Sequence, residues 1–216
     1  MSYFNLPIST NVNRFIAKNA FDTFTTTKQK KKFSDVIDKI TWLNKLSKET
    51  INLSGKEIIE IQIIEIKLKE KLLPKDLLEV IDRSIPYEII FILSFNEEIL
   101  LCTSKKHVHP INPDNAVIDW SFVSDWCLLK ENIYQLNLKI SLDYIYSDFC
   151  LQISNGPKEL KDIGQLIEHD KKTKGLKKQV LDLERNVNSE KQFKNKVELN
   201  IKLNKAKELL KKIDKD

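Results

Sequence analysis

The sequence predicts a mixed α/β (α+β) fold, a small mixed sheet covered by helices, followed by a basic helical arm. Three observations predict it: strand-like and helix-like segments alternate up to about residue 155, apolar heptad spacings replace them afterwards, and the positive charge is concentrated in that second part. We therefore expect a globular domain over residues 1–155 and a helical hairpin arm over residues 156–216.

The first helix is expected from Thr27, a residue type that caps helices, to about Ser47. Its apolar residues recur at intervals of three and four, as on an amphipathic helix. These are Phe33, Val36, Ile37, Ile40 and Leu43.

Residues 56–68 are rich in β-branched isoleucine and predict a strand. We expect Ile59, Ile61 and Ile63 on one face and apolar residues on the other. Such a strand belongs in the centre of a sheet. A short helix then begins at Pro74 and ends before Pro86.

The rest of the domain is predicted from turn signals and apolar periodicity. Residues 87–94 and 98–104 predict two strands of a hairpin, and the proline-containing residues 105–115 predict a loop. A further strand is expected over residues 117–129 and a helix over residues 138–153.

The arm carries two runs of apolar residues at heptad spacing, separated by a polar break at residues 186–192. Two helices joined by a turn would form an antiparallel hairpin, whereas one long coiled coil would make a homodimer. The sequence leaves both open.

The charge distribution also sets the arm apart. The formal net charge is +5, and residues 157–216 hold 17 Lys and Arg against 11 Asp and Glu, so the domain itself is nearly neutral. A basic arm is typical of a protein with an anionic partner, either nucleic acid or an acidic protein surface. A solvated helix can also carry such charge for solubility alone.

Several classes of protein are disfavoured by the composition. Cys102, Cys127 and Cys150 form no C-x-x-C pair, which indicates buried thiols in a reducing compartment. Four glycines and no glycine-rich loop argue against ATP hydrolysis. No apolar stretch approaches ~20 residues and the N-terminus is unlike a signal peptide, so we expect a cytoplasmic protein without membrane contact.

One pair of residues resembles a catalytic motif. Glu65 and Lys67, one residue apart on the predicted central strand, match the end of the PD-(D/E)xK nuclease site. Such a site needs a second acid to hold Mg²⁺, and between Trp42 and Glu65 only Glu49, Glu57 and Glu60 are available. We therefore interpret the pair first as an ion pair and second as a divergent nuclease site, and we leave the enzyme question open while favouring a non-enzymatic role.

No metal site or cofactor is predicted. His107 and His109 lie in a loop near Cys102, but a ligand set with suitable spacing is missing.

Nucleic acid could instead be bound by lysines in two places, the first predicted helix and the arm. The candidates are Lys28, Lys30, Lys31, Lys32, Lys177, Lys178, Lys191 and Lys194.

Three stretches, LPISTNVN at residues 6–13, KITWLNKLSKETINL at 39–53 and EKQFKNKVELN at 190–200, resemble an uncharacterised bacterial family of unknown function. The segments IEIKLKE at 64–70 and IDRSIPY at 81–87 also fit. The resemblance covers nearly the whole chain. Genes of that family lie beside DNA methyltransferases and superfamily-two helicases in restriction-like, anti-phage loci.

The resemblance implies a multi-protein system acting on DNA, with a helicase or methyltransferase as partner, and it carries over no catalytic residue. Phe193, Val197 and Asn200 share one face at the start of the last predicted helix and are the candidate partner-docking residues. The alternative is that Phe193 closes the hairpin by packing on Val187 or Leu183. Our leading hypothesis is a non-enzymatic accessory subunit, and a PD-(D/E)xK-type nuclease is the alternative.

Overall fold

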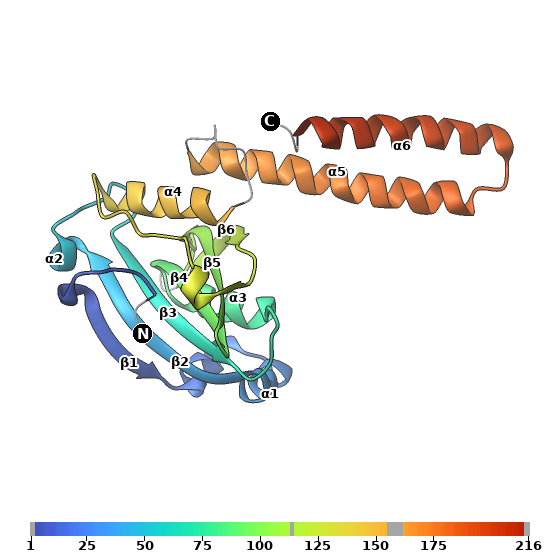
Figure 1. Ribbon diagram of the computed structural model, residues 1–216. Coiled ribbons are helices and arrows are strands. Elements are labelled where there is room, and N and C mark those ends of the chain that lie inside the picture. Colours follow the sequence, from blue (N-terminus) through green and yellow to red (C-terminus); the bar gives the residue numbers. More distant parts are fainter. Residues whose placement is uncertain (1–2, 113–114, 155–161, 214–216) are drawn as a thin grey trace. The chain divides into compact units, whose positions relative to one another are not determined.

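The computed structural model describes residues 3–112, 115–154 and 162–213, and the chain divides into two compact units, residues 1–155 and 156–216 (Figure 1). The first unit is a seven-stranded sheet with helices, and the second is a helical hairpin, so the expected α+β class is confirmed. The elements in chain order are η1 Ile8–Thr10, β1 Asn11–Ile16, η2 Lys18–Phe24, α1 Thr27–Val36, β2 Ile37–Ser47, α2 Lys48–Ile51, β3 Glu60–Leu68, α3 Lys75–Ser84, β4 Glu88–Phe95, β5 Glu98–Val108, β6 Ala116–Val123, β7 Cys127–Leu128, η3 Leu129–Glu131, α4 Leu142–Ile153, α5 Ile163–Ser189 and α6 Phe193–Ile213.

The sheet runs in the order β1-β2-β3-β4-β5-β6, and β7 pairs with β5. Strands β3 and β4 are parallel because α3 crosses over between them, and the other neighbouring strands pair antiparallel. The expected two-sided central strand is confirmed in β3, where Ile61, Ile63, Ile64 and Ile66 are all buried. Ile59 lies before the strand and is 70% exposed, so its expected place on the buried face was wrong.

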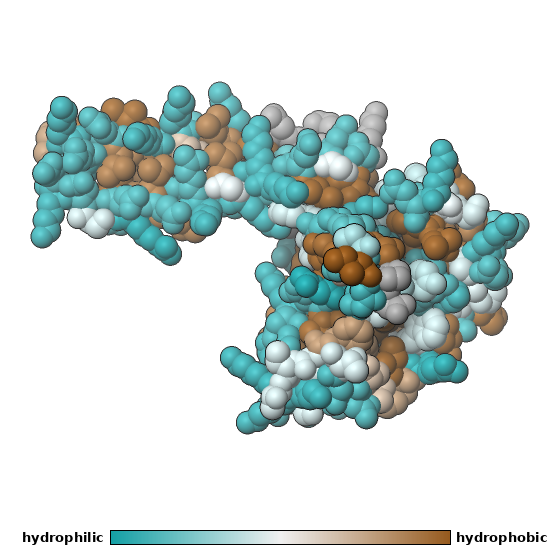
Figure 2. Space-filling view, turned by 180° about the vertical axis from the view of Figure 1, so that it is seen from behind, coloured by the Kyte–Doolittle hydropathy of each residue, from teal (hydrophilic) through white to brown (hydrophobic). Residues whose placement is uncertain are grey.

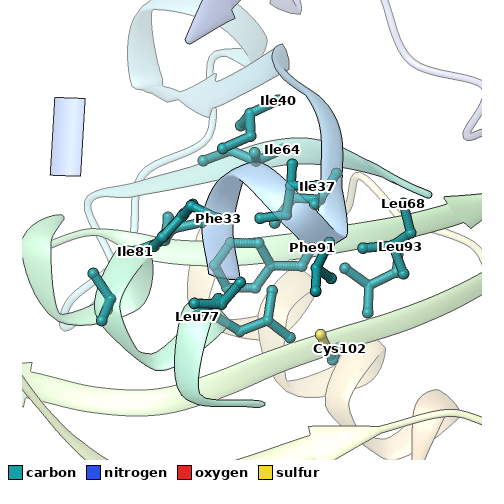
Figure 3. Close-up of a cluster of buried hydrophobic side chains, with 14 of the residues drawn as sticks. Phe33, Ile37, Ile40, Ile64, Leu68, Leu77, Ile81, Phe91, Leu93 and Cys102 are labelled. Atoms are coloured by element: carbon teal, nitrogen blue, oxygen red, sulfur yellow. The ribbon is translucent and has the colours of Figure 1, made fainter. Parts of the chain in front are cut away.

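One face of the sheet is covered by α1, α3 and η2. Phe33 of α1 and Leu77 and Ile81 of α3 pack against Ile64 and Phe91 of the central strands (Figure 3). This apolar cluster is the main core of the first unit. Cluster members labelled in the figure also include Ile37, Ile40, Leu68, Leu93 and Cys102.

The opposite face is covered by α4 over β3–β6, and the N-terminal segment lies over only part of β1–β3. Tyr146 of α4 donates a hydrogen bond to the Ser104 carbonyl (2.7 Å), and its hydroxyl lies 2.9 Å from Thr103 Oγ1. Phe4 packs edge-on against Phe149, with ring centroids 5.9 Å apart. The first residues of the chain are thereby held against the sheet.

The predicted helix over residues 27–47 is wrong in its second half. Helix α1 ends at Val36, and Ile37–Ser47 is strand β2, paired with β1 on one side and β3 on the other. Register shifts near Asp38 and Leu43 show that β2 is bulged. Because a bulge adds a residue, Ile37 and Ile40 reach the same core at a spacing of three, which imitates a helical stripe. Thr26, not Thr27, caps α1 in a capping box with Gln29.

Other boundaries also differ from the sequence prediction. Strand β1 was not predicted, and β5 continues to Val108 through residues expected in a loop. The single strand expected over 117–129 is divided into β6 and β7, and α4 starts at Leu142 after a Ser141 cap. The hairpin β4–β5 and the helix after Pro74 are confirmed.

The second unit consists of α5 and α6 packed side by side in an antiparallel hairpin (Figure 1). The residues between them are Val180, Val187, Leu203 and Ala206, with Leu183 and Leu199 alongside. Lys207 and Glu184 form an ion pair across the two helices at 2.7 Å. The hairpin alternative is therefore the one that the structure adopts.

A buried ion pair joins α3 to the sheet. The side chain of Lys106 in β5 is 0% exposed, and its Nζ donates to Asp82 Oδ1 (2.7 Å) and to the carbonyls of Asp82 (2.9 Å) and Ile85 (2.8 Å). Those carbonyls lie at the C-terminal end of α3, where the helix leaves acceptors without an internal donor. Every proton of the ammonium group is thus used.

We expect Lys106→Met to lower the free energy of unfolding by about 3–5 kcal/mol, because it leaves the Asp82 carboxylate buried and uncompensated. Urea unfolding measures the change. The matched control is Lys105→Met, which removes a lysine paired with the exposed Glu57 and should cost less than about 1 kcal/mol. Equal losses for the two variants would contradict the structural role of Lys106.

Glu88 at the start of β4 makes stability depend on pH. Burial raises the pKa of its carboxyl to about 7, against the opposing effect of Lys106 and Lys105. The folded chain therefore holds this proton more tightly than the unfolded chain, whose glutamate titrates near the ordinary value of 4.5. The contribution of Glu88 to stability is fully present below that value and is lost as the pH rises towards 7.

We expect Glu88→Gln to stabilise the protein at pH 8 by up to roughly 3 kcal/mol and to have little effect at pH 4. The measurement is urea unfolding at both pH values. Glu97→Gln, at an exposed position, is the control and should show no such difference between them. A stabilisation by Glu88→Gln that is the same at pH 4 and pH 8 would refute the titration.

Candidate functional sites

Glu65 ties the N-terminal segment to the sheet. Its Oε1 accepts hydrogen bonds from the Tyr3 hydroxyl and from Ser94 Oγ, the latter at 2.9 Å. Burial, followed by the bond to Glu65, raises the pKa of the Tyr3 phenol well above its ordinary value, so the phenol stays protonated and donates. The carboxylate suggested by the motif is therefore engaged with two hydroxyl groups.

Lys67 lies beside an acid that the sequence analysis did not consider. Its Nζ is 3.7 Å from Asp38 Oδ2, and both side chains are about half exposed. Asp38 sits at the first bulge of β2, opposite the end of β3. The predicted helix over residues 27–47 placed Asp38 outside the sheet, whereas the structure places it in β2 beside β3. Asp38 could have been found by treating residues 37–47 as a strand paired antiparallel with residues 60–68, because that pairing places Asp38 opposite the end of β3.

No metal centre is assembled in the part of the chain that the structure describes: His, Cys, Asp and Glu side chains nowhere gather there in a group of three or more suited to an ion. His107 Nδ1 lies 3.0 Å from Asp119 Oδ2, and His109 Nδ1 accepts the N–H groups of Ile111 and Asn112. Both histidines thus have local partners.

The three cysteines are free thiols. Cys102 and Cys150 are buried, as expected, whereas Cys127 is only partly buried.

The lysine run of α1 is partly neutralised. Lys30 pairs with Asp22 at 3.2 Å, and Lys32 pairs with Asp76 of α3. Lys28 and Lys31 are exposed. Two of the four predicted nucleic-acid contacts therefore carry an acidic neighbour.

The arm presents the other predicted lysines to solvent. Lys177 and Lys178 lie on α5, Lys191 lies in the turn, and Lys194 lies at the start of α6; all four are exposed. Helix α6 alone carries seven lysines against two glutamates. It is the more strongly charged of the two helices.

The predicted docking residues are also exposed. Phe193 is 82% and Val197 42% exposed, so the alternative in which Phe193 packs on Val187 or Leu183 was wrong. Asn200 is exposed and donates to the Lys196 carbonyl at 3.1 Å. Ile201, 63% exposed, follows Val197 by one turn. Figure 2 shows that hydrophobic and hydrophilic side chains are interspersed along the surface of the arm.

The sequence analysis also missed a pocket of about 290 Å³ beneath the N-terminal segment. Its polar lining comes from one tyrosine and two asparagines within residues 3–13 and from one asparagine of β2. These are Tyr3, Asn11, Asn13 and Asn44.

Residues 4–210 match the family described as a domain of unknown function, DUF4391. The chain belongs to the DUF4391 family. Because the match spans both units, the helical arm is part of the DUF4391 domain. No curated protein and no solved structure matches this DUF4391 chain. Within its described residues, no helix has the length and apolar character required to cross a bilayer.

Proposed function

We propose that this DUF4391 protein is a non-enzymatic accessory subunit of a bacterial DNA-directed defence system of the anti-phage, restriction-like type. Its partner is the helicase or DNA methyltransferase of the same system. The observation that carries the proposal is the exposed apolar stripe at the start of α6, formed by Phe193, Val197 and Ile201. The family resemblance supplies the class of partner.

The stripe is suited to docking because it faces away from the hairpin seam. Phe193, Val197 and Ile201 follow at intervals of four, whereas the seam is lined by Leu199, Leu203 and Ala206. Covering the stripe would bury one aromatic and two β-branched side chains, and buried aromatic anchors often carry much of the binding energy of an interface. The flanking lysines would favour an acidic surface on the partner.

The same arm supplies a direct contact with DNA. Lys177, Lys178, Lys191 and Lys194 are exposed on or between the two helices, and lysines in such positions neutralise phosphates with release of counterions. In this proposal the lysines of the arm contact the phosphates of the DNA on which the partner acts.

We expect the double change Phe193→Ser and Val197→Ser to abolish co-purification of the proposed helicase or methyltransferase partner. Truncating a hot spot costs ≥ ~2 kcal/mol, or roughly thirtyfold in affinity. Both residues are exposed, so the fold should be unchanged by circular dichroism. Leu181→Ser, on an exposed apolar residue of α5, is the control and should co-purify normally. Unchanged capture by the double variant would contradict docking through α6.

A second candidate function is a metal-dependent nuclease, and Asp38 is the observation that favours it. The β2–β3 pairing brings this acid beside Lys67, on the strand next to Glu65. A carboxylate on the neighbouring strand is what the Glu-x-Lys motif requires to hold Mg²⁺.

For that candidate we expect cleavage of plasmid DNA in Mg²⁺ or Mn²⁺ that stops in EDTA and is lost in both Asp38→Asn and Glu65→Gln. Gel assays with the purified chain measure it, and Asp119→Asn is a control acid away from β2 and β3. Absence of metal-dependent cleavage by the wild-type chain removes this candidate, whereas its presence would overturn the non-enzymatic proposal.

A further inference from the structure

Strands β1–β3 present three adjacent rows of residues on the face opposite the main core. Directly paired residues on neighbouring strands project from the same face of a sheet. The register therefore aligns Asn11 with Asn44 in one row, Phe15 with Thr41 and Glu65 in the next, and Lys39 with Lys67 in the third. Amide, aromatic and basic side chains thus succeed one another along this face.

The first row opens into the pocket of about 290 Å³. Its floor is apolar and includes buried residues of β3 and β4, while the N-terminal segment forms one wall. The apolar lining residues are Phe4, Leu6, Leu43, Ile63 and Ile92. The exposed surface of the pocket is mostly polar, which suits a ligand that presents hydrogen-bonding groups.

The polar groups of the pocket are oriented by their own hydrogen bonds. Asn44 Nδ2 donates to Thr10 Oγ1 (2.9 Å) and to Asn11 Oδ1 (3.0 Å). Both protons of that nitrogen are used, which leaves Asn44 Oδ1 to accept and Asn11 Nδ2 to donate. One free acceptor and one free donor can each pair with a polar group on the edge of a nucleobase.

The second row adds an aromatic surface. Phe15 is 57% exposed on β1, on the same face as Thr41. Exposed aromatic rings on strands are platforms on which unpaired bases stack, whatever their sequence. Glu65 in this row is an acceptor that suits an exocyclic amino group of a base.

The third row carries the positive charge. Lys39 is exposed, and Lys67 is 58% exposed in a 3.7 Å pair with the half-exposed Asp38. Because this ion pair is open to solvent, a phosphate group could take the place of Asp38 beside Lys67. Along β3, Lys67 follows Ile63 by four residues, about 13 Å at the ordinary rise of a strand, so the rows have room for more than one nucleotide.

We propose that this face of β1, β2 and β3 binds single-stranded nucleic acid. One unpaired base enters the pocket between Tyr3 and the amides of Asn11 and Asn44, the next stacks on Phe15, and Lys39 and Lys67 hold phosphates. A duplex is disfavoured because its bases are stacked inside the helix and cannot enter a recess beneath the N-terminal segment. The site goes beyond the proposed function, since it needs neither the α6 stripe nor the arm lysines.

The test is fluorescence anisotropy of the full-length chain with a labelled 12-nucleotide mixed-sequence DNA strand, the same sequence as RNA, and the DNA duplex. EDTA is present throughout, so cleavage cannot contribute. We expect the wild type to bind a single strand more tightly than the duplex. Phe15→Ala should weaken single-strand binding about tenfold. Lys39→Gln with Lys67→Gln should also weaken it and reduce the slope of log affinity against log salt by about 1.4.

Matched controls stand at exposed positions elsewhere in the first unit. Phe24→Ala removes another exposed ring, and Lys75→Gln with Lys139→Gln removes two other exposed lysines; both should bind as the wild type does. The Tm of each variant, measured by circular dichroism, establishes that it folds. Of the two single strands, the one bound more tightly identifies the source of the ligand as DNA or RNA.

A variant with glutamine at Lys177, Lys178, Lys191 and Lys194 separates this site from the arm. The proposal is supported if the four-lysine variant still binds the single strand and Phe15→Ala binds it more weakly. That result would stand even if the co-purification test of partner docking failed. Binding by Phe15→Ala within twofold of wild type, or a duplex bound as tightly as a single strand, would overturn it.

Discussion

The contact between Lys106 and the end of α3 is the constraint on which the arrangement of the first unit depends. A lysine whose side chain has no exposed surface is tolerated because a carboxylate and two helix-end carbonyls accept its three protons. The contact fixes the end of the crossover helix against β5. The α3 crossover makes β4 parallel to β3, and β3 is a central strand buried on both faces.

The bulges of β2 shape the face opposite that helix. At the first bulge the chain turns Ile37 and Ile40 towards the main core and leaves Asp38 near Lys67. At the second, Asn44 resumes pairing with Ile63 on the far face, next to the pocket. Without a bulge, the residues on one side of it would shift by one position and point to the opposite face of the sheet. The polar rows proposed to bind nucleic acid therefore exist because β2 is irregular.

The two proposed surfaces differ in their chemistry. The arm is a convex pair of helices with exposed lysines and the apolar stripe of Phe193, Val197 and Ile201, which suits phosphates and a partner's surface. The sheet face is recessed, with oriented amides and one exposed ring, which suits unpaired bases. A protein that accompanies a helicase or methyltransferase would meet both kinds of ligand.

The sequence by itself determined what depends on local order along the chain. The apolar run of β3, the turn between β4 and β5, the helix after Pro74 and the heptads of the arm all follow from the periodicity of neighbouring residues, and they were predicted correctly. Tertiary structure alone decided that Ile37–Ser47 is a strand, since a bulged strand paired on both sides can carry apolar residues at helical spacing. It also decided that Asp38 meets Lys67, that Tyr3 meets Glu65 and that Asn11 meets Asn44, because such contacts join residues tens of positions apart and no local pattern records them.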